Sequence, residues 1–239
     1  MIFAAGLGTR LRPLTNEIPK ALVPVNGKPA LEWLILKFKK AGITQIIINI
    51  HHFPDKVIGF INDNHSFGIE IKISDEREML LDTGGGLKKA AWFFDDGKPF
   101  LVHNADVLSN INLNEMLSFH NQKKALASLF IQERTTSRYL IFDEEKRLAG
   151  WKNTKTNEVI LSRENPASPK DFAFNGIHII DSEIFTLMTE QGKFSIIETY
   201  LRLASKFQIV GFEPKHAAWM DIGKLENLPE ANILAKQIY

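Results

Sequence analysis

The chain has 239 residues, of which 44% are hydrophobic, and its 29 basic and 28 acidic side chains give a formal net charge of +1. This balance predicts no attraction to nucleic acid or to an anionic membrane, and the lack of cysteine excludes disulfides and thiolate metal sites. No apolar run approaches the length of a membrane span and no signal peptide is evident, so we expect a cytoplasmic protein. The length favours one α/β domain over 1–239, as a monomer or a small homo-oligomer.

Strand and helix patterns alternate through the first half of the chain. An apolar run at 1–5 predicts a short buried strand. Further along, the sequence predicts helices at 31–38, 55–64 and 87–93, and strands at 44–50, 69–74 and 100–103. This alternation is typical of a doubly wound, mostly parallel mixed sheet.

The second half of the chain is less regular. It predicts strands at 125–132, 138–143, 146–151, 172–180 and 208–212, and helices at 195–205 and from about 224 onward. The strands at 138–143 and 146–151 are expected to form a hairpin, and 153–170 is a long polar stretch. We expect no C-terminal β-helix, because no hexapeptide repeat follows.

The loop after the first predicted strand combines flexible glycines with cations. Gly6 and Gly8 let the backbone approach a ligand closely, while Arg10 and Lys20 supply cationic donors, a combination that suits a polyphosphate. A dinucleotide-binding fingerprint would need a third glycine where Leu11 stands, and the loop lacks the Gly-Lys-Ser/Thr of ATPases. An ordinary glycine turn with solvated arginines is the alternative interpretation.

Three successive glycines at 84–86 remove every Cβ from a patch of backbone before the helix predicted at 87–93. A nucleobase or ribose could lie flat against such a patch. The alternative is a mobile loop or a turn that needs positive φ.

Two aspartates are candidate ligands of a metal ion. Asp106 follows the strand predicted at 100–103, and a carboxylate at the carboxyl edge of a sheet can hold Mg²⁺. Asp221 stands far along the chain, before Gly223. Spacing alone cannot pair the two, and an N-cap of the final helix is the alternative interpretation of Asp221.

The pattern Gly-x-Gly-Thr-Arg-x-x-Pro-x-Thr at 6–15, followed by Pro-Lys at 19–20, resembles the signature of sugar-1-phosphate nucleotidyltransferases, or nucleotide-sugar pyrophosphorylases. The resemblance covers nearly the whole chain, with further matching segments at 82–86, 104–106, 174–176 and 219–223. It implies a Rossmann-like, GT-A-like fold in which 1–110 bind the nucleotide and 111–239 the sugar. Within the family, the chain is most similar to short uridylyltransferases of cell-wall recycling that act on N-acetylmuramate 1-phosphate, then to mannose- or heptose-1-phosphate guanylyltransferases.

The resemblance also implies roles for individual residues. Asp106 and Asp221 would hold the Mg²⁺ that bridges a nucleoside triphosphate and a sugar 1-phosphate, Arg10 would bind the departing phosphates, and Lys20 would lie near the α-phosphate. The implied nucleotide contacts are Ala4, Ala5, Gly6, Gly8, Thr9, Arg10, Gly84, Gly85 and Asn104. Many guanylyltransferases have glycine at the position of Ala5, and its methyl group favours UTP over a purine nucleotide.

Sugar recognition is predicted in the second half. Asn175 and Gly176 resemble the family segment that contacts sugar hydroxyls, although a β-bulge at Gly176 is the alternative. Many relatives carry Glu-Lys-Pro just before this strand, with the lysine on the sugar phosphate. The nearest matches here are 150–153 and 163–166, and Lys152 is the candidate for that role. Glu198 is a further candidate for a sugar contact.

Two other classes of function remain to be weighed. A glycosyltransferase of related fold usually shows an Asp-x-Asp motif, which Asp106-Val107-Leu108 does not provide. A non-catalytic regulatory relative would lose the charged residues that this chain retains. We therefore expect an enzyme that joins a nucleoside triphosphate to a sugar 1-phosphate.

Overall fold

The structure, a computed structural model, describes residues 1–164 and 166–239. The chain folds into two compact units, each discontinuous in sequence. The first unit comprises Met1–Leu81, His103–Ile111 and His216–Tyr239, and the second comprises Asp82–Val102 and Asn112–Lys215. Residue 165, within the second candidate for the Glu-Lys-Pro segment, lies outside the described residues.

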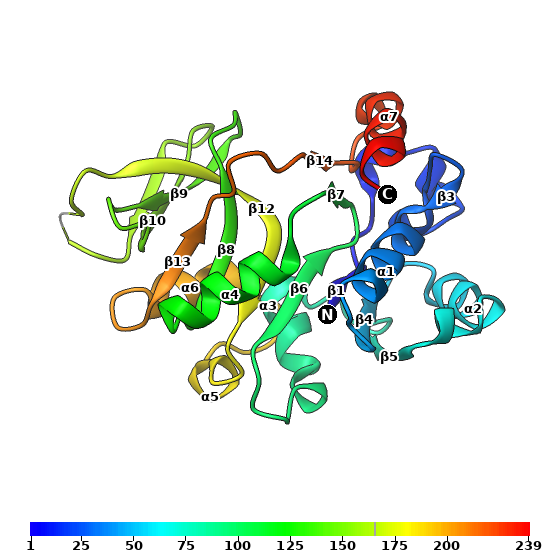
Figure 1. The fold of residues 1–239 in the computed structure, drawn as a ribbon, viewed down its shortest axis with the longest axis horizontal. Coiled ribbons are helices and arrows are strands. Elements are labelled where there is room, and N and C mark those ends of the chain that lie inside the picture. Colours follow the sequence, from blue (N-terminus) through cyan, green and yellow to red (C-terminus); the bar gives the residue numbers. More distant parts are fainter. Residues whose placement is uncertain (165) are drawn as a thin grey trace. The chain divides into compact units, whose positions relative to one another are not determined.

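The first unit is built on parallel strands (Figure 1). β1 (Ile2–Phe3) pairs in parallel with the end of β6 (Phe100–Asn104) and with β4 (Gln45–Ile50), which pairs in parallel with β5 (Glu70–Asp75). β4 is almost wholly buried, which explains its unbroken run of isoleucines. Helix α1 (Ala30–Lys40) precedes β4, and α2 (Pro54–Asp63) connects β4 to β5.

The end of the chain completes the first unit. β14 (Trp219–Asp221) pairs antiparallel with β7 (Val107–Ser109), and α7 (Leu228–Ile238) follows it. α7 packs on α1, where Trp33 stacks on Tyr239 with ring centroids 5.0 Å apart. A short antiparallel pair, β2 (Pro24–Val25) with β3 (Lys28–Pro29), adds to the same apolar cluster. This packing holds Asp221 beside the turn that follows β6.

The second unit contains a mainly antiparallel sheet. Its strands lie in the order β11 (Glu158–Leu161), β10 (Leu148–Asn153), β9 (Arg138–Phe142), β12 (Lys170–Ile180), β8 (Ala127–Gln132) and β13 (Ile209–Phe212). Only the β8–β13 pairing among these is parallel. The helices of this unit are α3 (Asp82–Lys89), α4 (Leu113–Lys123), α5 (Ile184–Leu187) and α6 (Ile196–Leu203).

The predicted α/β fold class is confirmed, as is the hairpin of β9 and β10. The helix predicted at 87–93 is wrong in its bounds, because α3 begins at Asp82 and ends at Lys89, before a short 3₁₀ helix at Ala91–Phe93. α4 and β11 were not predicted. α4 buries only Leu113, Met116 and His120, too few apolar positions for a clear helical pattern, and β11 lies within the polar stretch 153–170.

In the part of the chain that the structure describes, we find no helix with the length and apolar character needed to cross a bilayer.

Candidate active site

The glycine loop after β1 is held by two side chains from other segments. The backbone N–H of Ala4 donates to Asn49 Oδ1 at 2.8 Å, and the hydroxyl of Thr15 donates to the carbonyl of Gly8 at 2.7 Å. Gly8 has a φ of 65°, and a Cβ there would lie 2.9 Å from Thr15 Cγ2 and 3.1 Å from Lys20 Cβ. Both the backbone conformation and the available space therefore require glycine at this position.

A buried polar pair behind this loop was missed by the sequence analysis. Asn49 Nδ2 donates to Glu76 Oε1 at 2.8 Å, and Glu76 Oε2 accepts the backbone N–H of Leu81 at 3.1 Å. The pair joins the loop after β1 to the segment after β5. A signal was present, because Asn49 is the one polar residue in the isoleucine run of β4. Glu76 and Asn49 therefore position the backbone of the glycine loop.

Two carboxylates and two cations from four segments of the first unit lie together. The pairing of β14 with β7 sets Asp221 opposite Val107, and the N–H of Ile222 donates to the carbonyl of Asp106 at 2.9 Å. Lys20 forms an ion pair with Asp106, and Arg10 Nη2 lies 3.6 Å from Asp221 Oδ2. The structure therefore brings together four residues that the sequence could only name separately.

The backbone of Gly223 is the point at which these groups meet. A Cβ added to Gly223 would lie 2.6 Å from Asp221 Oδ1, 2.8 Å from Lys20 Nζ and 2.9 Å from Arg10 Nη2. The N–H of Gly223 also donates to Asp221 Oδ1 at 2.6 Å. Glycine therefore leaves room for three charged groups to approach one another, a role that the sequence analysis did not identify.

The charges at this point affect one another. Burial raises the pKa of Asp221, and the charge of Asp106 raises it further. The N–H of Gly223 and the charges of Lys20 and Arg10 act in the opposite direction. The pKa of Asp221 is raised overall, so its carboxylate form is costly in this setting and would be stabilised by an added cation.

The helix-cap interpretation of Asp221 is wrong. Asp221 ends β14, whereas α7 begins at Leu228 with Asn227 as its N-cap residue. Asn227 reaches back, and its Nδ2 donates to the carbonyl of Asp221 at 2.6 Å. The Asp221 carboxylate is therefore not used to cap the final helix.

Asp106 and Asp221 also offer a fitting donor set for magnesium. Within the described ranges, no group of three or more His, Cys, Asp or Glu side chains could hold a metal ion by itself. Mg²⁺, however, is commonly bound by one or two carboxylates together with the phosphates of a substrate. The raised pKa of Asp221 agrees with a site that binds a further positive charge. The two aspartates therefore have the chemistry of magnesium ligands.

The predicted nucleotide contacts divide between the two units. Those of the first unit are Ala4, Ala5, Gly6, Gly8, Thr9, Arg10 and Asn104, and those of the second are Gly84 and Gly85. Ala4 and Ala5 are buried, Thr9 opens a 3₁₀ helix (Thr9–Leu11), and Asn104 ends β6 opposite Phe3. Their contacts with a nucleotide stay predictions.

The triple glycine has a packing function within the second unit. The N–H groups of Gly84 and Gly85 donate to the carbonyl of Phe194 at 2.9 and 3.3 Å, and a Cβ on Gly84 would collide with the Phe194 ring. Gly84 therefore lets α3 approach the start of α6. The loop and positive-φ interpretations of this segment are wrong, because 84–86 are helical.

The residues predicted to contact the sugar take part in structural contacts within the second unit. Asn175 is only 1% exposed, and Gly176 has a φ of 72° where the register of β12 against β8 shifts, which confirms the β-bulge. Lys152 forms an ion pair with Asp171. Glu198 Oε1 accepts the N–H of Ser195 at 3.0 Å in the capping box of α6. Their roles toward a sugar stay predictions.

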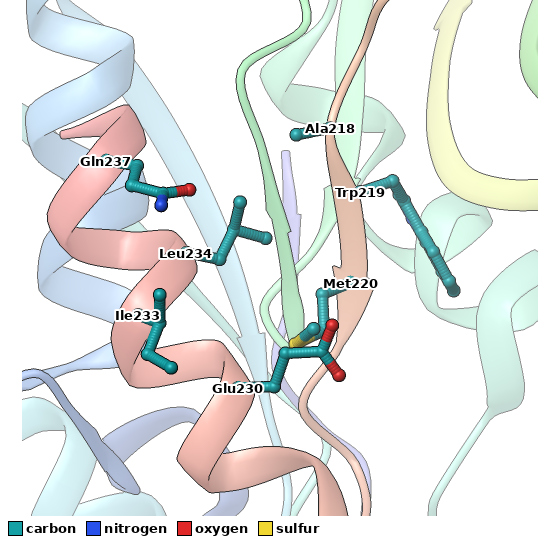
Figure 2. A pocket seen from close by; sticks show the side chains of 7 residues that line it. All are labelled: Ala218, Trp219, Met220, Glu230, Ile233, Leu234 and Gln237. Carbon is teal, nitrogen blue, oxygen red and sulfur yellow. The ribbon is translucent and has the colours of Figure 1, made fainter.

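A pocket of about 240 Å³ lies between β14 and α7 (Figure 2). Its lining residues are Ala218, Trp219, Met220, Glu230, Ile233, Leu234 and Gln237. The strand that carries Asp221 therefore borders this pocket.

Comparisons with known proteins place the chain in a family. The model of the family described as "Nucleotidyl transferase" matches residues 1–237. The chain is 32% identical over 244 residues to N-acetylmuramate alpha-1-phosphate uridylyltransferase of Caulobacter vibrioides, covering 99% of this chain and 94% of that protein. It is 27% identical over 260 residues to the UTP–glucose-1-phosphate uridylyltransferase of a Synechocystis species, covering 100% of this chain and 64% of that protein. Among solved structures, UDP-glucose pyrophosphorylase complexed with UDP-glucose matches with a TM-score of 0.76 and 19% identity, covering 100% of this chain and 98% of that chain.

Proposed function

Because the chain belongs to the nucleotidyl transferase family, we propose that it transfers a nucleotidyl group from a nucleoside triphosphate to a sugar 1-phosphate. The observation that carries this proposal is the convergence of Arg10, Lys20 and Asp221 on Gly223, with Asp106 beside them. A polyphosphate and a metal ion need this mixture of cations and carboxylates.

The proposed substrates are UTP and N-acetylmuramate 1-phosphate. The Caulobacter relative, which matches over nearly its whole length, is an N-acetylmuramate alpha-1-phosphate uridylyltransferase by name, and the Synechocystis relative is also a uridylyltransferase by name. Ala5, which stands where many guanylyltransferases have glycine, is the sequence feature that favours UTP. We also propose a cytoplasmic location, where nucleoside triphosphates are available.

The reaction needs no nucleophile from the protein. A phosphate oxygen of the sugar 1-phosphate, already an anion at neutral pH, forms a bond to the α-phosphorus of the triphosphate. The bond from the α-phosphorus to the bridging oxygen breaks, and pyrophosphate leaves with that electron pair. The protein must bring two anions together and hold them in line, so positioning and charge neutralisation supply the catalysis.

Each charged residue has a proposed part in this step. Arg10 lies on an exposed 3₁₀ turn with its side chain 56% exposed, so it can bind the departing pyrophosphate. Lys20 is mostly buried beside Asp106 and would hold the α-phosphate. Asp106 and Asp221 would hold Mg²⁺, which when bound supplies charge neutralisation at the phosphate oxygens.

The test is pyrophosphate release with each common nucleoside triphosphate against a panel of sugar 1-phosphates, in the presence of Mg²⁺. We expect the highest kcat/KM with UTP and N-acetylmuramate 1-phosphate. Preference for GTP with mannose or heptose 1-phosphate would instead support the guanylyltransferase alternative. Absence of pyrophosphate release with every pair would contradict an enzymatic function and leave the regulatory alternative.

A further inference from the structure

The backbone N–H of Ala4, the first residue after β1, is paired with a side chain rather than with a neighbouring strand. β1 ends at Phe3, which lies opposite Asn49 in the parallel pairing of β1 with β4. The N–H of Ala4 donates to Asn49 Oδ1 at 2.8 Å, and both residues are buried. Because an unpaired buried N–H is costly, this hydrogen bond lets the chain leave the sheet at Ala4 and begin the glycine loop.

Glu76 determines the orientation of the Asn49 amide. Asn49 Nδ2 donates to Glu76 Oε1 at 2.8 Å, and Glu76 Oε2 accepts the N–H of Leu81 at 3.1 Å, so both oxygens of this buried side chain act as acceptors. A flipped amide would set its NH₂ group against the N–H of Ala4 and its oxygen against a carboxylate oxygen. Glu76 therefore fixes the amide of Asn49, and that amide fixes Ala4.

The other end of the glycine loop is held by separate contacts. The hydroxyl of Thr15 donates to the carbonyl of Gly8 at 2.7 Å, and His52 Nε2 lies 3.3 Å from the carbonyl oxygen of Thr15. Asn49 and His52 thus contact the chain on both sides of the backbone that is predicted to bind the nucleotide. Loss of the Asn49 contact would release only the end at Ala4 and leave the contact at Gly8 in place.

We propose that Asn49 is a positioning residue for the nucleoside triphosphate, which it aligns through the backbone of the glycine loop without touching the nucleotide itself. This inference rests on the proposed function. Because the contact is made at the loop, Asn49 acts on the affinity for the nucleotide and not on the affinity for the sugar 1-phosphate. A merely structural asparagine would change the folded fraction of the protein but not the nucleotide affinity of the folded molecules.

The first test measures the binding of a non-hydrolysable UTP analogue with Mg²⁺ by isothermal titration calorimetry. Asn49→Leu keeps the size of the side chain but removes both hydrogen bonds, so the Kd should rise by about 5- to 50-fold. The stoichiometry reports the folded fraction, which separates a loss of affinity from a loss of folded protein. In turnover at saturating UTP, the KM for the sugar 1-phosphate should stay within about twofold of its value in the unchanged protein.

The second test uses the pH dependence of Asn49→Asp. This variant keeps an acceptor for Ala4 but sets a second carboxyl group against Glu76. Two carboxylates at this distance share a proton as the pH falls, and that proton restores the hydrogen bond. The ratio of the variant's Kd to that of the unchanged protein should therefore fall at least about threefold from about pH 8.5 to about pH 6. His51, whose Nδ1 lies 2.7 Å from the Glu76 carbonyl oxygen, is present in both proteins, so its titration cancels from the ratio.

The matched control is Asn62→Asp, at an exposed asparagine of α2, which should bind the analogue like the unchanged protein at both pH values. Normal affinity in Asn49→Leu, or the same Kd ratio for Asn49→Asp at both pH values, would overturn the assignment while leaving the proposed function intact. The affinity measurements need no turnover. Failure of the proposed function is seen separately, as the absence of pyrophosphate release by the unchanged protein with every pair of substrates.

Discussion

The two units differ in what surrounds the residues that the sequence motifs single out. In the first unit, charged side chains from separate segments face one another around the backbone of Gly223. In the second unit, Gly84, Asn175 and Glu198 are each engaged in a contact within their own unit. A motif residue is therefore a candidate for catalysis where the fold places its charge beside other charges. Where the residue takes part in packing or hydrogen bonds within its own unit, those contacts give it a structural function.

Loss of the carboxylate of Asp106 or of Asp221 should have the largest effect on activity. We predict that Asp106→Asn and Asp221→Asn each lower the kcat/KM of pyrophosphate release by about 1000-fold, because an amide cannot hold the metal or balance the cations. The thermal unfolding midpoint should change by less than about 2 °C. Asp96→Asn, at an exposed aspartate of the second unit, is the matched control. If Asp221→Asn unfolds the protein but retains specific activity, Asp221 is structural.

Gly223→Ala should reduce activity while leaving the fold stable. The added Cβ would displace the charged ends of flexible side chains, so we predict a loss of about 10- to 100-fold in kcat/KM with little change in the unfolding midpoint. Gly59→Ala is the control, because Gly59 lies within α2 with no atom near its Cβ position. A large loss of stability without loss of specific activity would show that Gly223 is not part of the active site.

Gly84→Ala should show the opposite pattern. Its Cβ would collide with the ring of Phe194 and lie 3.0 Å from the backbone nitrogen of Ile196. We predict a loss of about 1–3 kcal/mol in the free energy of unfolding, measured in urea, with kcat/KM per folded molecule kept within about threefold. Abolished activity in a protein of normal stability would contradict a packing role for the missing Cβ of Gly84.

Arg10→Gln should lower kcat/KM, because it removes the proposed contact with pyrophosphate. It should also give the smallest of the predicted shifts, a change in pH dependence. The charge of Arg10 lowers the pKa of Asp221, so removing it lets that pKa rise further. The carboxylate then becomes protonated at a higher pH, and the acid limb of the pH profile of kcat/KM should move to higher pH. Arg12→Gln, at an exposed arginine of the same segment, should not move it. A shift to lower pH would contradict the coupling.

Local sequence patterns were sufficient to predict the parallel strands of the first unit. The isoleucine run of β4, the turn after β1 and Asp106 at the end of β6 are features of contiguous sequence, and each was placed correctly. The Gly84 segment shows the limit of such patterns. A glycine run has low helix propensity, and its hydrogen bonds to the carbonyl of Phe194 are contacts that no local pattern could predict.

The rest of the site depends on contacts between distant segments. Asp221 reaches Asp106 through the pairing of β14 with β7, and nothing near Asp221 in the sequence specifies that pairing. Asn49 reaches the glycine loop through its hydrogen bond with the backbone N–H of Ala4, which lies 45 residues earlier in the chain. Tertiary hydrogen bonds of this kind have no periodicity for a sequence pattern to detect.

Metal binding is the most direct test of the site around Gly223. Mn²⁺ can be titrated in the presence of a non-hydrolysable UTP analogue and followed by electron paramagnetic resonance, in the unchanged protein and in the Asp106→Asn, Asp221→Asn double variant. We predict that the double variant binds Mn²⁺ at least about tenfold more weakly, because both carboxylate ligands are lost. Equal Mn²⁺ affinity in the two proteins would contradict a metal site at Asp106 and Asp221.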